Sequence, residues 1–180
     1  KKNFDSDLDA VTDFQLFYAI QKGLTEPFGW EEGLRRIELT LSHDGLYADP
    51  ENLVTFLDNH DLSRFYATIQ RDFDLYKMGM SLLYTLRGIP CIYYGTEILM
   101  DQTADPDAKV RADFPGGWSG DANNFFVSSA TQPNGRKGEM DQAFRFCSKL
   151  GNYRKENAWL GTAKLRQFVP ENNTYEYFRY

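Results

Sequence analysis

The sequence predicts an α/β protein in which short parallel strands alternate with helices. Three candidate strands, at 9–13, 53–57 and 88–94, are separated by segments whose apolar residues recur at helical spacing. The second and third segments are apolar at successive positions, which is typical of parallel strands covered by helices. Long helical crossovers join strands of this kind. Toward the end of the chain the pattern changes to two strands joined by a tight turn, which predicts a hairpin.

The first two expected elements form one strand–helix unit. Residues 9–13 (DAVTD) are predicted to form a short strand, and Phe14 to Leu24 a helix that ends before Pro27 and Gly29. A more polar helix, with a solvated face, is expected from Glu31 to Leu41.

The next strand, Leu53 to Leu57, is followed by the polar residues 58–61 (DNHD). A mostly buried helix is predicted from Asp72 to Leu86, with Asp72 or Asp74 at its N-terminal end, where a carboxylate favours the helix dipole. Gly88 is expected to end that helix.

Pro90 is expected to open the third strand, a position at which proline is tolerated. A long loop follows from Leu99 to Asn134, and a loop of this length is usually functional or disordered. An amphipathic helix is predicted from Met140 to Arg154.

Strands at 165–169 and 174–180 are predicted to form the hairpin, around the turn 170–173. The change from strand–helix alternation to paired strands predicts a domain boundary near 158–163. We therefore expect one domain over residues 1–160 and the start of a second over 161–180.

Composition and charge limit the kinds of molecule that the chain is expected to bind. The net charge of −6 and the pI near 5.0 argue against nucleic acid, whose phosphates require clustered basic side chains. No apolar run is long enough to predict a membrane span. Cys91 and Cys147 lie in apolar segments without metal-ligand spacing, so we interpret both as buried free thiols. The opening residues, KKNFD, indicate the interior of a longer protein.

The strand ends at 58–61 and 95–97 carry the candidate chemistry. Asp61 and Glu97 follow successive parallel strands, and such ends share one edge of the sheet, where ligand sites gather. The two carboxylates could meet across a sugar as acid and nucleophile, or bind loop backbone or an arginine. For Asp61 a functional role in the site is favoured, and for Glu97 a structural role is favoured.

Other residues near Asp61 are assigned supporting roles. His60 is interpreted as a hydrogen-bonding group rather than a metal ligand, because the chain has only two histidines. Asn59 is expected to orient His60 or its loop, and Asp58 to be a turn residue or a support for the site. Arg64 is either the partner of a pocket carboxylate or a surface residue, and both Asn59 and Arg64 are counted among the candidate substrate-binding residues. The sequence has no Gly-rich phosphate loop, serine nucleophile elbow or CxxC pair, which argues against the corresponding enzymes.

Two motifs resemble the α-amylase family of glycoside hydrolases. Residues 56–61 (FLDNHD) resemble the Phe-x-x-Asn-His-Asp signature after the seventh barrel strand, and 88–97 (GIPCIYYGTE) resemble the Gly-x-Pro-x-Ile-Tyr-Tyr-Gly-x-Glu motif of the eighth. Residues 9–20 are similar to the sixth strand and helix of the cyclomaltodextrinase and neopullulanase branch. The insertion 113–118 (DFPGGW) is similar to neopullulanase-like starch-utilisation enzymes of gut bacteria.

This resemblance implies a fold and a site. The chain would supply about strands six to eight of a (β/α)8 TIM barrel, followed by the start of an all-β C-terminal domain. Asp61 would be the transition-state stabiliser, which holds the sugar hydroxyls, and His60 would bind the same sugar. Trp118 and Phe114 would either stack on glucose rings or fold the loop onto the barrel. The motif that carries the family's nucleophile, Gly-x-Arg-x-Asp, is absent here, as is the acid.

The resemblance also implies a retaining enzyme that cleaves α-glucosidic bonds in maltodextrins, cyclomaltodextrins or pullulan; transglycosylation would use the same residues. The 180 residues alone are expected to be inactive and to need the rest of the polypeptide, or another copy, to cover the open barrel. No cofactor is required, and calcium would find its usual ligands upstream. The substrate implies a bacterial periplasm or cell surface. The alternative is a non-catalytic amylase-like carbohydrate-binding or transport-associated protein, against which the intact Asn59-His60-Asp61 triplet counts.

Overall fold

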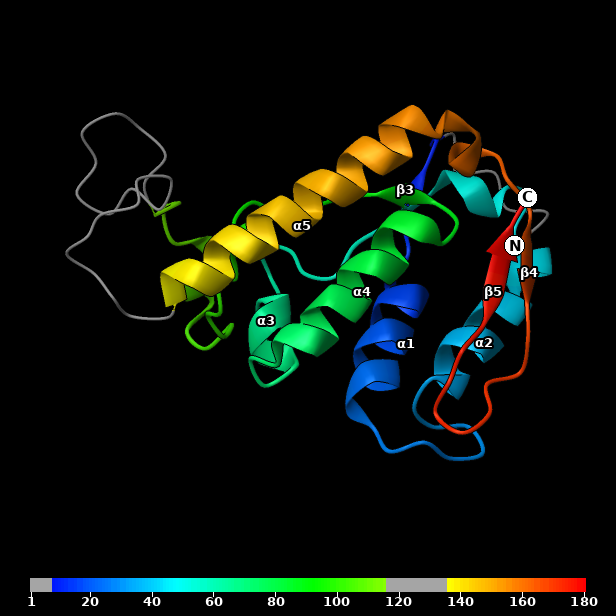
Figure 1. Ribbon diagram of the computed structural model, residues 1–180, viewed down its shortest axis with the longest axis horizontal. Coiled ribbons are helices and arrows are strands. Elements are labelled where there is room, and N and C mark those ends of the chain that lie inside the picture. The colour runs from blue at the N-terminus through cyan, green and yellow to red at the C-terminus, as the bar shows by residue number, and fades with distance from the viewer. Residues whose placement is uncertain (1–7, 116–135) are drawn as a thin grey trace.

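The sheet that organises the chain is small and parallel (Figure 1). The computed structural model describes residues 8–115 and 136–180. Strands β1 (Val11–Thr12), β2 (Leu53–Thr55) and β3 (Ile89–Pro90) pair in the order β1-β2-β3. Both pairings are parallel, as predicted, so the carboxyl ends of all three strands share one edge.

Helices fill the connections between the strands. The α-helices are α1 (Phe14–Thr25), α2 (Arg35–Ser42), α3 (Phe65–Thr68), α4 (Phe73–Thr85) and α5 (Arg136–Glu156). Five short 3₁₀ helices complete the helical elements of the described residues: η1 (Asp44–Leu46), η2 (Pro50–Asn52), η3 (Thr96–Ile98), η4 (Asp107–Arg111) and η5 (Ala158–Gly161).

The predicted helices that follow β1 and β2 are confirmed, and each begins at an aspartate. The Asp13 carboxylate accepts a hydrogen bond of 3.0 Å from the backbone N–H of Leu16 at the start of α1. The Asp72 carboxylate accepts bonds of 2.8 and 3.0 Å from Asp74 and Leu75 at the start of α4. These side chains satisfy N–H groups that have no partner inside the helix.

The polar helix predicted from Glu31 begins later, at Arg35. Gly33 has a φ of +59°, which lies outside the helical range, so the chain turns there. The Gly33 carbonyl then accepts a 3.0 Å hydrogen bond from Arg36, and the helix continues from that turn.

The third strand is shorter than predicted. Its last ladder bond runs from the N–H of Cys91 to the carbonyl of Thr55, at 2.7 Å, and the chain turns at Gly95, with a φ of +85°. Cys91 is exposed, so the prediction that it is buried was wrong, whereas Cys147 in α5 is buried and free as predicted. Cys91 lies two residues after Ile89 and so faces the same side of the strand, which the described residues leave uncovered.

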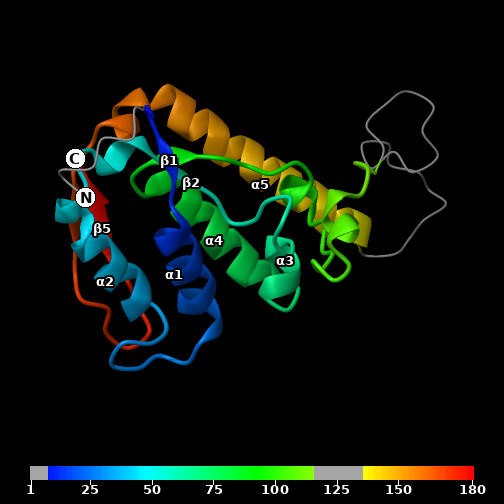
Figure 2. The same ribbon diagram turned by 180° about the vertical axis from the view of Figure 1, so that it is seen from behind.

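The core lies mainly among the helices that pack on one face of the sheet, and Figure 2 shows the chain from the strand side. Side chains from α1, α2, α4 and α5 form it, among them Leu16, Ile20, Ile37, Leu41, Tyr76, Met80, Leu83 and Cys147. Thr12, Val54 and Ile89 are paired with one another across the three strands, so their side chains lie on the same face of the sheet. Ile89 is 46% exposed and Thr12 is also exposed. The described chain therefore leaves apolar surface of the sheet uncovered.

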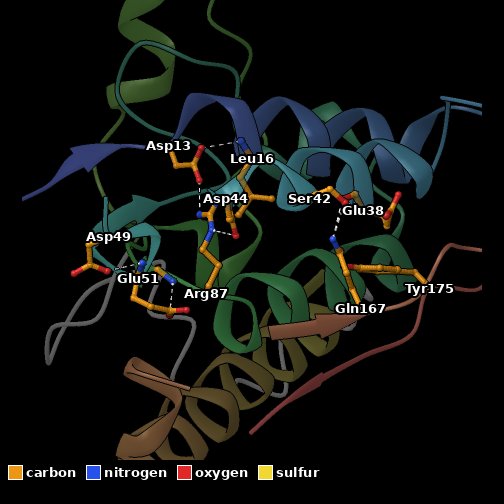
Figure 3. Close-up of polar contacts among 11 residues, drawn as sticks. Asp13, Leu16, Glu38, Ser42, Asp44, Asp49, Glu51, Arg87, Gln167 and Tyr175 are labelled. Carbon is orange, nitrogen blue, oxygen red and sulfur yellow. Dashed lines mark hydrogen bonds and ion pairs between the residues drawn. The ribbon is translucent and has the colours of Figure 1, made fainter. Parts of the chain in front are cut away.

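A buried arginine, Arg87, connects three separate segments of the chain (Figure 3). Arg87, 1% exposed, donates to the Asp13 carboxylate at 2.5 Å and to both oxygens of Asp44 at 2.8 and 2.7 Å. Because the charge is shared with two carboxylates, its burial is compensated. This contact joins the β1–α1 junction, η1 and the entry to β3.

The predicted C-terminal hairpin is confirmed. Strands β4 (Leu165–Gln167) and β5 (Tyr177–Arg179) pair antiparallel, with a further bridge between Glu171 and Thr174. The Gln167 amide donates to the carbonyl of Glu38 at 3.0 Å, which fixes the hairpin to α2 (Figure 3). The domain boundary near 158–163 stays a prediction.

Within the described ranges, none of the helices has the length and hydropathy that a membrane span requires.

Candidate active site

The carboxyl end of β2 carries a polar tip, defined as residues 58–61. Phe56 and Leu57 remain buried after the strand ends, as does Asp58. The side chains of His60 and Asp61 are then 62% and 61% exposed. The tip therefore divides into a buried anchor and an exposed pair.

Asp58 is the anchor, so of its two interpretations the turn residue was wrong, and its contacts agree with a support for the site. Its carboxylate accepts hydrogen bonds from the N–H of Phe65 at 2.9 Å and from the Thr96 hydroxyl at 2.7 Å. It also lies 3.6 Å from Nε of Arg64. Burial raises the pKa of Asp58, against these hydrogen bonds and the arginine charge, which lower it. Asp58 thus joins the ends of β2 and β3.

Asn59, His60 and Asp61 lie in one turn. The Asn59 side-chain oxygen accepts a 2.9 Å hydrogen bond from the N–H of Asp61, so Asn59 fixes the backbone of the carboxylate residue. Nε2 of His60 lies 3.2 Å from Oδ2 of Asp61. Two neighbouring hydrogen-bonding side chains therefore face solvent together, which suits the recognition of a polyhydroxylated ligand.

Arg111, at the end of η4, is a site residue that the sequence did not predict. Its guanidinium donates to Oδ1 of Asp61 at 2.7 Å and to the carbonyl of His60 at 2.9 Å. It also lies 2.8 Å from the Asp107 carboxylate. Nothing in the spacing marks Arg111, because it is brought to Asp61 across fifty residues by the fold.

Arg64 is fully buried, so its interpretation as a surface residue was wrong. It donates to the carbonyls of Val110, at 3.3 Å, and of Tyr94, and its guanidinium carbon lies 4.4 Å from the centre of the Tyr93 ring. Together with the Asp58 carboxylate at 3.6 Å, these contacts explain its burial. The burial argues against Arg64 as a direct sugar contact.

Glu97 does not share the contacts of Asp61. It lies in η3 and lines a cavity of about 530 Å³ with residues of α4 and α5, including Tyr84 and Cys147. One of its carboxylate oxygens is buried without a hydrogen-bond partner among the described residues. The structural role favoured for Glu97 stays a prediction.

Of the two aromatic candidates in the insertion, only Phe114 lies within the described residues. Phe114 is half-buried and lies three residues beyond Arg111, which leaves its stacking role a prediction. Trp118 lies outside the described residues. No group of three or more His, Cys, Asp or Glu side chains that could hold a metal ion occurs in residues 8–115 and 136–180.

A model of a protein family matches most of the chain. The matching model is described as the α-amylase catalytic domain, and the match covers residues 36–164. That range includes both strand-end motifs, the polar tip and Arg111.

Individual relatives agree with this match. A cyclomaltodextrin glucanotransferase of Niallia circulans is 45% identical over 67 residues, which are 36% of this chain and 9% of the relative. An α-amylase of the same organism is 31% identical over 133 residues, 74% of this chain and 21% of the relative. The chain therefore spans about a fifth or less of the length of these curated relatives.

A solved structure agrees in fold. The α-amylase of Geobacillus thermoleovorans, solved with acarbose, has a TM-score of 0.70 and 24% identity. The likeness covers 96% of this chain and 34% of that one.

Proposed function

Because this chain belongs to the α-amylase catalytic-domain family, we propose that it supplies the sugar-gripping part of an active site for α-glucosidic bonds. The observation that carries the proposal is the exposed pair of His60 and Asp61 at the carboxyl edge of a parallel sheet. Ligands of such sheets bind at this edge.

The proposal places β1, β2 and β3 as strands six, seven and eight of a (β/α)8 barrel. The parallel order, the helices on one face and the likeness to a third of a whole α-amylase support this placement. Residues 1–160 then complete the barrel, and 161–180 begin a C-terminal β-domain. The uncovered face of the sheet would form the barrel interior with the strands that precede this chain.

Asp61 acts in this proposal as the transition-state stabiliser. Its carboxylate accepts hydrogen bonds from hydroxyls of the sugar at the cleaved bond, and its negative charge favours the positive, oxocarbenium-like sugar. His60, 3.2 Å away, donates to the same ring. The nucleophile and the acid of a retaining double displacement lie upstream of this chain.

The proposed substrates are maltodextrins, cyclomaltodextrins or pullulan. The relatives include an α-amylase and a cyclomaltodextrin glucanotransferase, so either water or a sugar hydroxyl is a reasonable acceptor. Hydrolysis and transglycosylation both require the same binding of the donor sugar. A periplasmic or surface location stays a prediction.

Asp61→Asn in the full-length protein tests the proposal. We expect kcat/KM on maltooligosaccharides to fall by about 10²-fold or more, because the amide lacks the charge that stabilises the transition state. Asp141→Asn is the matched control: Asp141 is half-exposed on α5 and pairs with Arg145 at 2.7 Å. Unchanged turnover in Asp61→Asn would contradict the assignment. An inactive native protein that still binds maltooligosaccharide would favour the non-catalytic alternative.

A further inference from the structure

We propose that Arg111 is a positioning residue that holds the Asp61 carboxylate in the orientation required by the sugar. The proposal rests on the function proposed above and goes beyond it, since it assigns a role to a residue in the loop after β3. Three observations support it. Arg111 makes two hydrogen bonds at the polar tip, other residues hold Arg111 and its backbone in place, and Arg111 contacts only one of the two carboxylate oxygens of Asp61.

The contact at the polar tip is double. Arg111 donates through Nη2 to Oδ1 of Asp61, at 2.7 Å, and through Nε to the carbonyl of His60, at 2.9 Å. The same planar group therefore holds the side chain and the adjoining backbone. A planar fork with two donors restricts orientation as well as distance, which a single surface ion pair does not.

The backbone around Arg111 is held by groups from the end of β3 and by Arg64. The carbonyl of Val110 accepts from Arg64 at 3.3 Å and from the Tyr93 hydroxyl at 3.4 Å. The Tyr94 hydroxyl donates to the carbonyl of Ala112 at 2.8 Å. Val110 itself is 0% exposed. These contacts fix the chain on both sides of Arg111 against the carboxyl edge of the sheet.

A second carboxylate orients the guanidinium itself. Asp107, four residues earlier in η4, lies 2.8 Å from Nη2 of Arg111. The arginine is therefore flanked by Asp107 on its own helix and by Asp61 on the polar tip. This arrangement restrains the side chain before any sugar arrives, which is the preorganisation that an active site requires.

The contact leaves Asp61 able to bind a sugar. Arg111 contacts Oδ1, whereas Oδ2 lies 3.2 Å from Nε2 of His60. Each carboxylate oxygen can accept two hydrogen bonds, so one site on each remains for a sugar hydroxyl. Asp61 would otherwise be free to rotate, because its side chain is 61% exposed.

An exposed ion pair contributes little to folding stability. The Arg111 side chain is 48% exposed. Its loss should therefore change turnover with little effect on the thermal unfolding of the protein. This difference separates a positioning role from a structural one.

The test uses Arg111→Gln and Arg111→Lys in the full-length protein, assayed on maltooligosaccharides. We expect kcat of Arg111→Gln to fall about tenfold to hundredfold with KM changed less than about threefold, because misplacing a catalytic group by an ångström costs this much. Arg111→Lys keeps the charge without the fork and should recover part of the loss. Arg145→Gln, which breaks an exposed pair on α5, is the control and should match the native protein.

A double variant links the effect to Asp61. If Arg111 acts through Asp61, then Asp61→Asn with Arg111→Gln should be within about twofold of Asp61→Asn alone, because effects of groups that act as a unit do not add. Independent, multiplicative losses would overturn the proposal, as would a kcat of Arg111→Gln within twofold of the native value. Loss of activity in Asp61→Asn without loss in Arg111→Gln would leave the proposed function standing and remove only the role of Arg111.

Discussion

Asp58 and Asp61 are three residues apart on the same strand end, yet they have opposite environments. Asp58 is 2% exposed and contacts Phe65, Thr96 and Arg64. Asp61 is mostly exposed and faces His60 and Arg111. The first carboxylate holds the strand ends together, and the second remains available for a ligand.

Asp58→Ala should destabilise the protein strongly. The change leaves the Arg64 charge and two hydrogen-bond donors buried without their partner, and breaking a buried ion pair costs about 3–5 kcal/mol. Urea unfolding of the full-length protein measures the loss of unfolding free energy. The matched Asp141→Ala, in an exposed pair, should cost less than about 1 kcal/mol. Equal effects of the two changes would refute the anchoring role of Asp58.

The two cysteines should differ in reactivity toward a thiol reagent. Burial raises the pKa of Cys147 to about 11, so the neutral thiol is the favoured form and the reactive thiolate is a minor species, roughly one part in a thousand, at pH 8. Cys91 is exposed. In the 180 residues expressed alone, at pH 8, we expect rapid labelling of Cys91 alone, with Cys147 labelled after denaturation or as the pH rises toward 11. Mass spectrometry of the labelled peptides gives the answer, and Cys91→Ser identifies the site.

At the scale of elements, close packing between helices decides where side chains fit. A Cβ at Gly79 in α4 would lie 2.3 Å from the Phe65 ring and 3.3 Å from Leu24. A Cβ at Gly151 in α5 would meet only the Tyr84 ring and hydroxyl, at 3.7 Å or more. The same substitution should therefore have opposite effects in the two helices.

Gly79→Ala should destabilise the protein by about 1–3 kcal/mol, because the added methyl group forces the Phe65 ring to move. Gly151→Ala should stabilise it by about 0.5–1 kcal/mol, because it reduces the entropy of the unfolded chain and adds no clash. Thermal unfolding of both variants tests the pair. A gain in stability from Gly79→Ala would show that α3 and α4 pack less tightly than the structure indicates.

At the scale of the whole molecule, the sheet has one face that the helices leave open. Ile89 is 46% exposed, Thr12 at the same register level is also exposed, and β3 has no further strand paired to it within the described residues. Exposed strand edges and apolar surfaces promote association. An isolated piece with this surface should not persist as a monodisperse monomer.

The 180 residues expressed alone should self-associate and fail to cleave maltooligosaccharides. Light scattering measures the first property and reducing-sugar release the second. Co-expression with the upstream part of the same polypeptide should restore turnover, because that part would supply the missing carboxylates and cover the sheet. Robust turnover by the isolated chain would contradict the proposed division of the active site.

The sequence by itself determined the parallel strand–helix alternation, the start of one helix after the first strand and of another near Asp72, the hairpin and the polar tip. These features depend on local periodicity, capping and turn chemistry, which neighbouring residues express directly. It also pointed to Asp61 and His60, through motifs that resemble a family.

Only the tertiary structure decided which polar residues support that pair. Arg64 and Asp58 are buried, and Arg111 meets Asp61, because the folded chain brings the segment before residue 112 onto the end of β2. Contacts between residues that are tens of positions apart in the sequence leave no periodic signal in it. Whether a charged side chain is buried depends on partners from other elements. The exposure of Cys91 has the same origin, since it shares a face of the sheet with Ile89 and nothing in the described ranges covers that face.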